Sequence, residues 1–176
     1  MNNKGKRSIY NITIASLFLA ISIIMPQVVH LVGVEAGKIL LPLFWGVACA
    51  ALILPLPYVL YIAILSPLLS SFITGMPPVP MLYFMLIEIP LYGVFVHVLH
   101  KKFSAPVSIL LGLIGSRTVY IVSVVFAVNV LGMQMQGAAL TMLLIGVFKS
   151  IPGIIAQMII APLSERVYLG RRHYEQ

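Results

Sequence analysis

Four charged residues stand inside apolar segments of this sequence. Arg117 interrupts LLGLIGSRTVYIVSVVF, Glu88 interrupts MLYFMLIEIPLYG, Lys149 precedes SIPG, and Lys38 precedes ILLPLFW. A charge at the centre of a membrane-spanning helix costs about 2.5–3.5 kcal/mol on insertion scales, so such a residue is a candidate for function. At a helical rise of 1.5 Å per residue, Arg117 lies about 17 Å and about 20 Å from the ends of its apolar segment, close to mid-depth.

Aromatic and polar residues accompany these charges at helical spacing. Phe84 and Tyr92 flank Glu88 four positions away on either side, and Tyr120 follows Arg117 by three. If these groups face one cavity, they would suit a small planar polar ligand, with rings stacking on it and charges orienting it. Taken singly, Trp45 and Tyr92 are better explained as core residues. The candidate substrate-binding residues are Glu88, Arg117, Lys149, Tyr92, Phe84, Trp45, Lys38, Tyr120 and Gln157.

A structural ion pair is the alternative interpretation of two of these charges. Glu88 is the only plausible acidic partner of Arg117 on a neighbouring segment. Lys149 would then be buried without a partner, unless it reaches the interface or Glu35. An unpaired buried charge is costly. We therefore favour a ligand-binding site, while the structural pair remains open.

Other chemistries have little support in the sequence. It has four acidic residues and no paired-carboxylate, nucleophile-elbow or H-E-x-x-H motif, so we predict no enzyme and no catalytic residue. Cys49 is the single cysteine, and His97 and His100 are expected at the membrane interface, so we predict no metal site. The segment GVEAGKI has too few residues between its glycines for a phosphate loop, and Ile39 replaces the required Ser or Thr.

These residues must be positioned by membrane-spanning helices. The 176 residues are 61% hydrophobic and 9% charged, whereas a soluble domain is about 25% charged. A bilayer core about 30 Å thick needs about 20 apolar residues as helix. We predict an all-α integral membrane protein, a single domain over 1–176 with six transmembrane helices. Their predicted bounds are Ile9–Met25, Gly37–Leu54, Tyr58–Thr74, Met81–Leu99, Pro106–Val130 and Ala139–Tyr168.

Lysine and arginine set the predicted orientation. With six spans, three basic places fall on one side, which is the cytoplasmic side by the positive-inside rule. Both termini are then cytoplasmic, and the net charge of +7 reflects topology rather than nucleic-acid binding. The basic residues are Lys4, Lys6, Arg7, Lys101, Lys102, Arg166, Arg171 and Arg172.

Three stretches carry a family resemblance: EAGKILLPLFWG, LSPLLSSFITGMPPVPMLYFMLIEIPLYG and PGIIAQMIIAPL. Together with six spans and cytoplasmic termini, they make the chain similar to a substrate-binding S component of an energy-coupling factor (ECF) vitamin transporter. The resemblance implies a prokaryotic cell-membrane protein that binds a small ring-containing vitamin or precursor from outside, in the outer halves of spans four to six. It also implies docking on a membrane scaffold subunit with two ATPase subunits, which use the ATP; the chain itself needs no cofactor.

The first span offers a candidate contact for that scaffold. Ser16 and Ala20 are four residues apart, a small-xxx-small spacing that lets another helix approach closely, within the chain or from a partner. The resemblance assigns scaffold docking to an A-x-x-x-A pattern in this span; here serine takes the first place, and Ala15 can also take part. Two other functions stay open: a stand-alone ion- or proton-coupled carrier using Glu88 and Lys149, and a membrane enzyme or non-transporting assembly partner.

Overall fold

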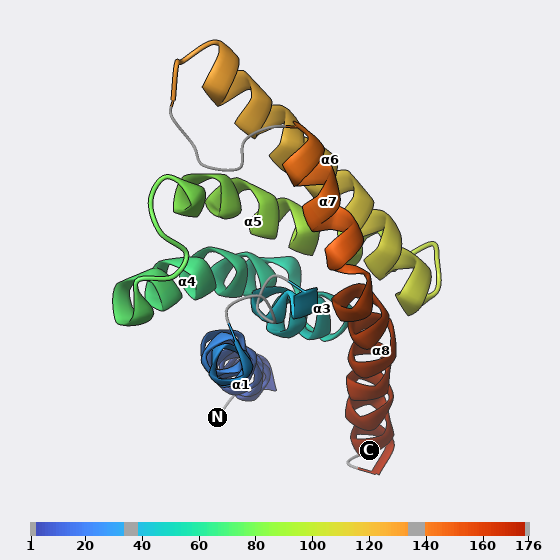
Figure 1. Cartoon of the computed structure of the whole chain (residues 1–176). Coiled ribbons are helices and arrows are strands. Elements are labelled where there is room, and N and C mark those ends of the chain that lie inside the picture. The colour runs from blue at the N-terminus through green and yellow to red at the C-terminus, as the bar shows by residue number, and fades with distance from the viewer. Residues whose placement is uncertain (1–2, 34–38, 134–139, 175–176) are drawn as a thin grey trace.

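The computed structural model describes residues 3–33, 39–133 and 140–174, and these ranges fold into helices and turns without a strand. Figure 1 looks nearly along the first helix, with α4 and α5 layered beside it and α6 and α8 on the outer sides. The predicted all-α class is confirmed for these ranges. The helices are α1 (Asn3–Val32), α3 (Pro42–Ile53), α4 (Leu56–Thr74), α5 (Met81–Leu99), α6 (Ala105–Asn129), α7 (Leu140–Lys149) and α8 (Ile151–Tyr174).

Four of these helices are long and apolar enough to cross a membrane, as expected of a multi-pass membrane protein. They contain the apolar stretches Arg7–Val29, Leu56–Thr74, Met81–Leu99 and Ala105–Asn129. The predicted bounds of the third, fourth and fifth spans agree with α4, α5 and α6 to within two residues at each end. The first predicted span was too short at both ends, because α1 continues through Pro26.

The short helix α3 occupies the middle of the fold. It has 12 residues and is therefore about 18 Å long, less than the thickness of a bilayer core. Helices α1, α4, α5 and α8 all pack against it, and its side chains from Pro42 to Ala51 are buried apart from partly buried Trp45. The predicted second span began at Gly37, which lies outside the described residues.

The predicted sixth span is two helices rather than one. Helix α7 ends at Lys149 and α8 begins at Ile151, so the continuous helix expected from Ala139 to Tyr168 is wrong. Pro152 has no N–H group to continue the ladder of helical hydrogen bonds, and its ring crowds the preceding turn. The N–H of Ser150 instead bonds back to the carbonyls of Gly146 and Val147. Residue 139 lies outside the described ranges.

Glycines allow the closest helix contacts. A Cβ added to Gly46 of α3 would collide with the hydroxyl of Ser22 and the carbonyl of Phe18, both on α1. A Cβ added to Gly112 of α6 would lie 2.7 Å from a methyl group of Val96 on α5. At these glycines the backbone of α3 approaches α1, and the backbone of α6 approaches α5. The close packing holds α3, α5 and α6, which carry most of the polar and aromatic residues described next, in fixed positions.

Candidate functional site

A buried ion pair joins α5 and α6 at the centre of the candidate site. Nε of Arg117 lies 3.1 Å from Oε1 of Glu88, whose side chain is 1% exposed. The N–H of Arg117 is not directed at this oxygen, so both atoms are buried without a hydrogen bond. The two charges are therefore close enough to form an ion pair, but they make no hydrogen bond to each other. A buried donor or acceptor without a hydrogen bond lowers the stability of the fold.

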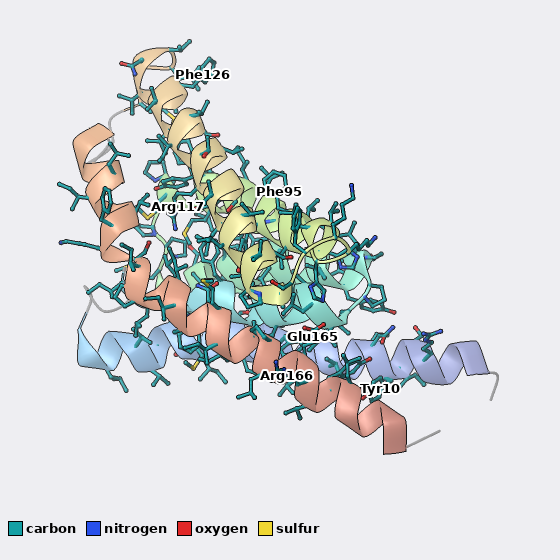
Figure 2. The ribbon with its side chains drawn as sticks, turned by 90° about the vertical axis from the view of Figure 1, so that its right-hand side faces the viewer. Tyr10, Phe95, Arg117, Phe126, Glu165 and Arg166 are labelled. Atoms are coloured by element: carbon teal, nitrogen blue, oxygen red, sulfur yellow. The ribbon has the colours of Figure 1, made fainter. Side chains whose placement is uncertain are left out.

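Two aromatic rings flank the guanidinium group. Cζ of Arg117 lies 5.7 Å from the ring centre of Phe44 on α3 and 5.4 Å from that of Tyr120 on the same helix as Arg117. Phe84 of α5 meets Tyr120 edge to face, with 6.3 Å between ring centres. Cation–π contacts of this kind hold the guanidinium plane without using its N–H donors. Figure 2 shows Arg117 on the flank of α6 that faces α7.

A second polar contact lies on the other side of Phe44. The hydroxyl of Tyr92 donates a hydrogen bond of 2.9 Å to Oε1 of Gln157, which links α5 to α8. Both side chains are at most 1% exposed, and Nε2 of Gln157 is buried without a hydrogen-bond partner. The ring of Phe44 packs against Tyr92 with 5.2 Å between centres. Phe44 thus connects the ion pair to the buried amide.

Six of the nine predicted substrate-binding residues belong to this connected cluster. The cluster holds one carboxylate, one guanidinium, one amide and two tyrosine hydroxyls among aromatic rings. No group of three potential metal ligands occurs among the described residues. The six residues are Glu88, Arg117, Tyr92, Phe84, Tyr120 and Gln157.

The other three predicted substrate-binding residues are Trp45, Lys149 and Lys38. The indole N–H of Trp45 donates to the carbonyl of Leu40 at 2.8 Å, so it caps the segment before α3. Lys149 is exposed at the end of α7, so the expectation that it is buried on a face with Gln157 is wrong. Lys38 lies outside the described residues.

Phe44 is the member of the cluster that the sequence did not reveal. It is adjacent to Trp45, which was selected because it shares a helical face with Lys38. Helix α3 is apolar on all sides, so no polar face indicates which of its aromatic residues turns toward the charges. A buried guanidinium near mid-depth predicts that some aromatic ring lies against it, but not which one.

A groove of about 420 Å³ lies between α5 and α6 beside the cluster. Phe84 lines it and also meets Tyr120, which places one end of the groove next to the arginine's ring contacts. Its wall is mostly apolar, formed by the start of α5 and the end of α6. The other lining residues are Tyr83, Ile87, Val122, Ser123, Phe126, Ala127, Leu131 and Met133.

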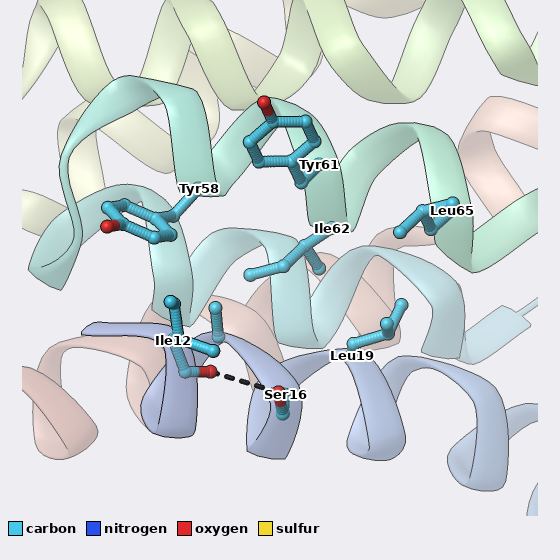
Figure 3. Close-up of a pocket in the computed structure, with 8 residues that line it drawn as sticks. Ile12, Ser16, Leu19, Tyr58, Tyr61, Ile62 and Leu65 are labelled. Atoms are coloured by element: carbon cyan, nitrogen blue, oxygen red, sulfur yellow. Dashed lines mark hydrogen bonds between the residues drawn. The ribbon is translucent and has the colours of Figure 1, made fainter. Parts of the chain in front are cut away.

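A second groove, of about 270 Å³, lies between α1 and α4. Figure 3 shows the residues that line it, with Ser16 and Leu19 on α1 and Tyr58, Tyr61 and Leu65 on the neighbouring α4. The hydroxyl of Ser16 bonds the carbonyl of Ile12 at 3.0 Å, so it presents little polar character to the groove. Of the three residues predicted to contact a scaffold subunit, Ala15 and Ser16 line this groove and Ala20 is exposed near it.

Comparison of the chain with protein-family models, with curated proteins and with solved structures finds no match. The functional argument therefore depends on the cluster and the two grooves.

Proposed function

We propose that this chain is the membrane-embedded binding subunit of an importer for a small ring-containing vitamin or vitamin precursor. Its membrane is the cell membrane of a prokaryote, and a separate scaffold subunit with two ATPase subunits drives uptake, as the ECF-type resemblance implies. The observation that carries the proposal is the buried cluster around Glu88 and Arg117, whose charges are brought together while their hydrogen bonds are left unmade.

The unused hydrogen-bond donors of the cluster favour a ligand site over a purely structural ion pair. A pair that only locked α5 to α6 would gain most by aligning its hydrogen bonds, since a charge-assisted bond is about twice as strong as a neutral one. Arg117 instead lies between two rings with Nε unbonded, and Gln157 keeps an unbonded Nε2 nearby. A ligand with hydrogen-bond acceptors would provide partners for the N–H groups of Arg117 and Gln157. Lys149 is exposed, so the proposed site consists of Glu88, Arg117, Gln157 and the rings around them.

The packing of the helix ends supports an orientation with both termini on the cytoplasmic side. The ring of Tyr10 lies 6.1 Å from that of Tyr168, which brings the start of α1 beside the end of α8. Nε2 of His100 lies 2.7 Å from Oε1 of Glu165, which brings the end of α5 to α8. The basic residues near these helix ends thus gather at one end of the bundle, as the positive-inside rule requires of six spans.

Purification of the full chain, followed by mass spectrometry of any compound that it retains, tests the proposal. We expect a retained vitamin-like compound with a dissociation constant of about 1 nM, or roughly −12 kcal/mol. The substitutions Glu88→Ala and Arg117→Ala should each weaken binding about tenfold to hundredfold, the value of a hydrogen bond to a charged group. Arg166→Ala, at an exposed arginine outside the cluster, should bind as the wild type does.

Two results would contradict the proposal. One is normal binding by folded Glu88→Ala and Arg117→Ala variants, with folding checked by circular dichroism and gel filtration. The other is uptake into vesicles that contain this chain without any ATPase, which would identify a stand-alone carrier. If an alanine variant does not fold, Glu88→Gln keeps the side-chain volume while removing the charge.

A further inference from the structure

The free end of the Arg117 guanidinium group specifies one chemical feature of the ligand. The contact of Glu88 with the group is at Nε, 3.1 Å from Oε1. Among the guanidinium nitrogens, Nε is the one that is both buried and unbonded, so the two Nη atoms open onto accessible space. No group in the described ranges accepts a hydrogen bond from either Nη, and the side chain is 18% exposed.

The surrounding rings hold this end of the group in a fixed direction. Phe44 comes from α3 and Tyr120 from α6, so two different helices restrain the guanidinium plane. Tyr120 is itself held by Phe84 of α5. Arginine loses less conformational entropy per hydrogen bond when its planar fork is already oriented. The terminal N–H groups are thus positioned before a ligand arrives.

An oxyanion is the partner that fits two parallel N–H donors. Carboxylate and phosphate groups place two oxygens at the spacing of the fork and accept two parallel charge-assisted bonds. A single carbonyl oxygen fills only one of the two positions. Because Glu88 lies on the Nε side, the width of the guanidinium group separates its carboxylate from an anion at the Nη end.

We infer that the ligand presents a carboxylate or phosphate-type oxyanion to the two Nη groups of Arg117, while its apolar body lies against the aromatic walls. This inference rests on the proposed binding function and narrows its substrate class to anionic compounds. Such an oxyanion can belong to a free small molecule or to a phospholipid headgroup. We assign it to a free small molecule, because Phe84, whose ring meets that of Tyr120, lines an apolar groove with space for a compact organic body.

Matched acid and neutral probes test this inference on the full chain in nanodiscs of phosphatidylcholine. The probes are pantothenate with pantothenol, nicotinate with nicotinamide, biotin with biotinamide, and inorganic phosphate, each measured by calorimetry. We expect at least one acid to bind about tenfold to hundredfold more tightly than its neutral partner, the range for hydrogen bonds to a charged group. Arg117→Gln should abolish this difference, and Arg166→Gln, with the same change of charge at an exposed site, should keep it.

Further arms separate the ways in which the inference can fail. Arg117→Lys keeps the positive charge but loses the two parallel N–H donors, so it should bind the acid more weakly than the wild type does. Equal binding by this variant and the wild type would overturn the inference, even if Arg117→Gln does not fold. A retained or bound compound that is neutral would overturn it and leave the binding function standing. Binding of no probe and retention of no compound would overturn both. Arg117-dependent retention of phosphatidylglycerol alone, in nanodiscs containing that lipid, would overturn assignment to a free small molecule.

Discussion

At the residue scale, one hydrogen bond of the cluster is expected to contribute to the stability of the bundle. The hydroxyl of Tyr92 is the described partner of the Gln157 amide, and both residues are buried between α5 and α8. A polar group without a partner in an apolar interior is destabilising, although interhelical bonds in membranes measure only about 0.6 kcal/mol on average and at most about 1.7. The bond is therefore worth measuring on its own.

Removal of the Tyr92 hydroxyl isolates this contribution. We expect Tyr92→Phe to lower the free energy of unfolding by about 1 kcal/mol, because the Gln157 amide then has no partner at either end. Tyr83→Phe removes the same hydroxyl from a side chain that is 55% exposed, and it should change stability little. Titration of the refolded protein with sodium dodecyl sulfate in mixed micelles measures both. Equal stabilities of the two variants would show that the buried bond contributes nothing.

Depth and helical spacing were sufficient to predict much of the candidate site. Glu88 and Arg117 were found because charges in apolar segments are costly, and Phe84, Tyr92 and Tyr120 because they lie three or four positions from a charge. Lys149 was misplaced because the same spacing was carried through Ser150, where the helix breaks. Phe44 could not be found, since a helix that is apolar all round carries no periodic signal.

At the element scale, the contact between α1 and α3 depends on the absence of a side chain. Gly46 lets the two helices meet where a Cβ would collide with Ser22 and with the backbone carbonyl of Phe18. Backbone atoms cannot rotate away as a flexible side chain can, so the helices themselves must separate. Small residues at such positions are the main device for close packing in membranes.

Replacement of glycine by alanine at two sites tests this dependence. Gly46→Ala should lower the free energy of unfolding by about 1–3 kcal/mol, the usual penalty for overpacking. Gly146→Ala is the matched control, because a Cβ there has nothing within 4 Å. Alanine is the better helix former, so Gly146→Ala should be neutral or stabilising by up to about 1 kcal/mol. The melting temperatures of the two variants measure this difference. Equal melting temperatures would show that the α1–α3 contact does not depend on glycine at position 46.

Hydropathy predicted the positions of α4, α5 and α6, but not the ends of α1, the short length of α3 or the break after α7. Helices α4, α5 and α6 expose apolar side chains along their length, so the apolar run and the helix coincide. Helix α3 is covered by protein on all sides and need not reach across a bilayer, so its length is not set by membrane thickness. Proline inside α1, α4, α5 and α8 did not end those helices, whereas Pro152 accompanies the break after α7.

At the scale of the whole molecule, the candidate site and the α1–α4 groove are separate surfaces. None of the cluster residues lines the groove. In the proposed importer, ligand binding and scaffold docking are therefore expected to be separable by mutation. Few polar groups line the groove, and on α1 its lining residues are small or aliphatic. Such a surface suits packing against another apolar helix.

A bulky side chain in the groove tests this separation. Ser16→Trp should leave the dissociation constant of the ligand unchanged but lower ATP-dependent uptake at least about tenfold, equivalent to about 1.4 kcal/mol of docking energy. Leu17→Trp is the control, because Leu17 is 59% exposed on α1 and does not line the groove. Uptake assays in liposomes with the scaffold and ATPase subunits compare the two. Loss of ligand binding in Ser16→Trp, or normal uptake, would contradict the docking surface.

The two contacts between α5 and α8 set the cost of moving one helix against the other. Tyr92 meets Gln157, and eight residues further along each helix His100 meets Glu165, so the pairs repeat in the same register. Helix α8 packs mainly against α3 and α6, which leaves these polar side chains as bridges to α5. Hydrogen bonds can be exchanged singly, at about 0.5–1.5 kcal/mol each. By contrast, separating α5 from α6 must pull apart the interlocked surfaces of Val96 and Gly112. The α5–α8 contact can therefore be remade one hydrogen bond at a time, whereas the α5–α6 contact has to open as a whole.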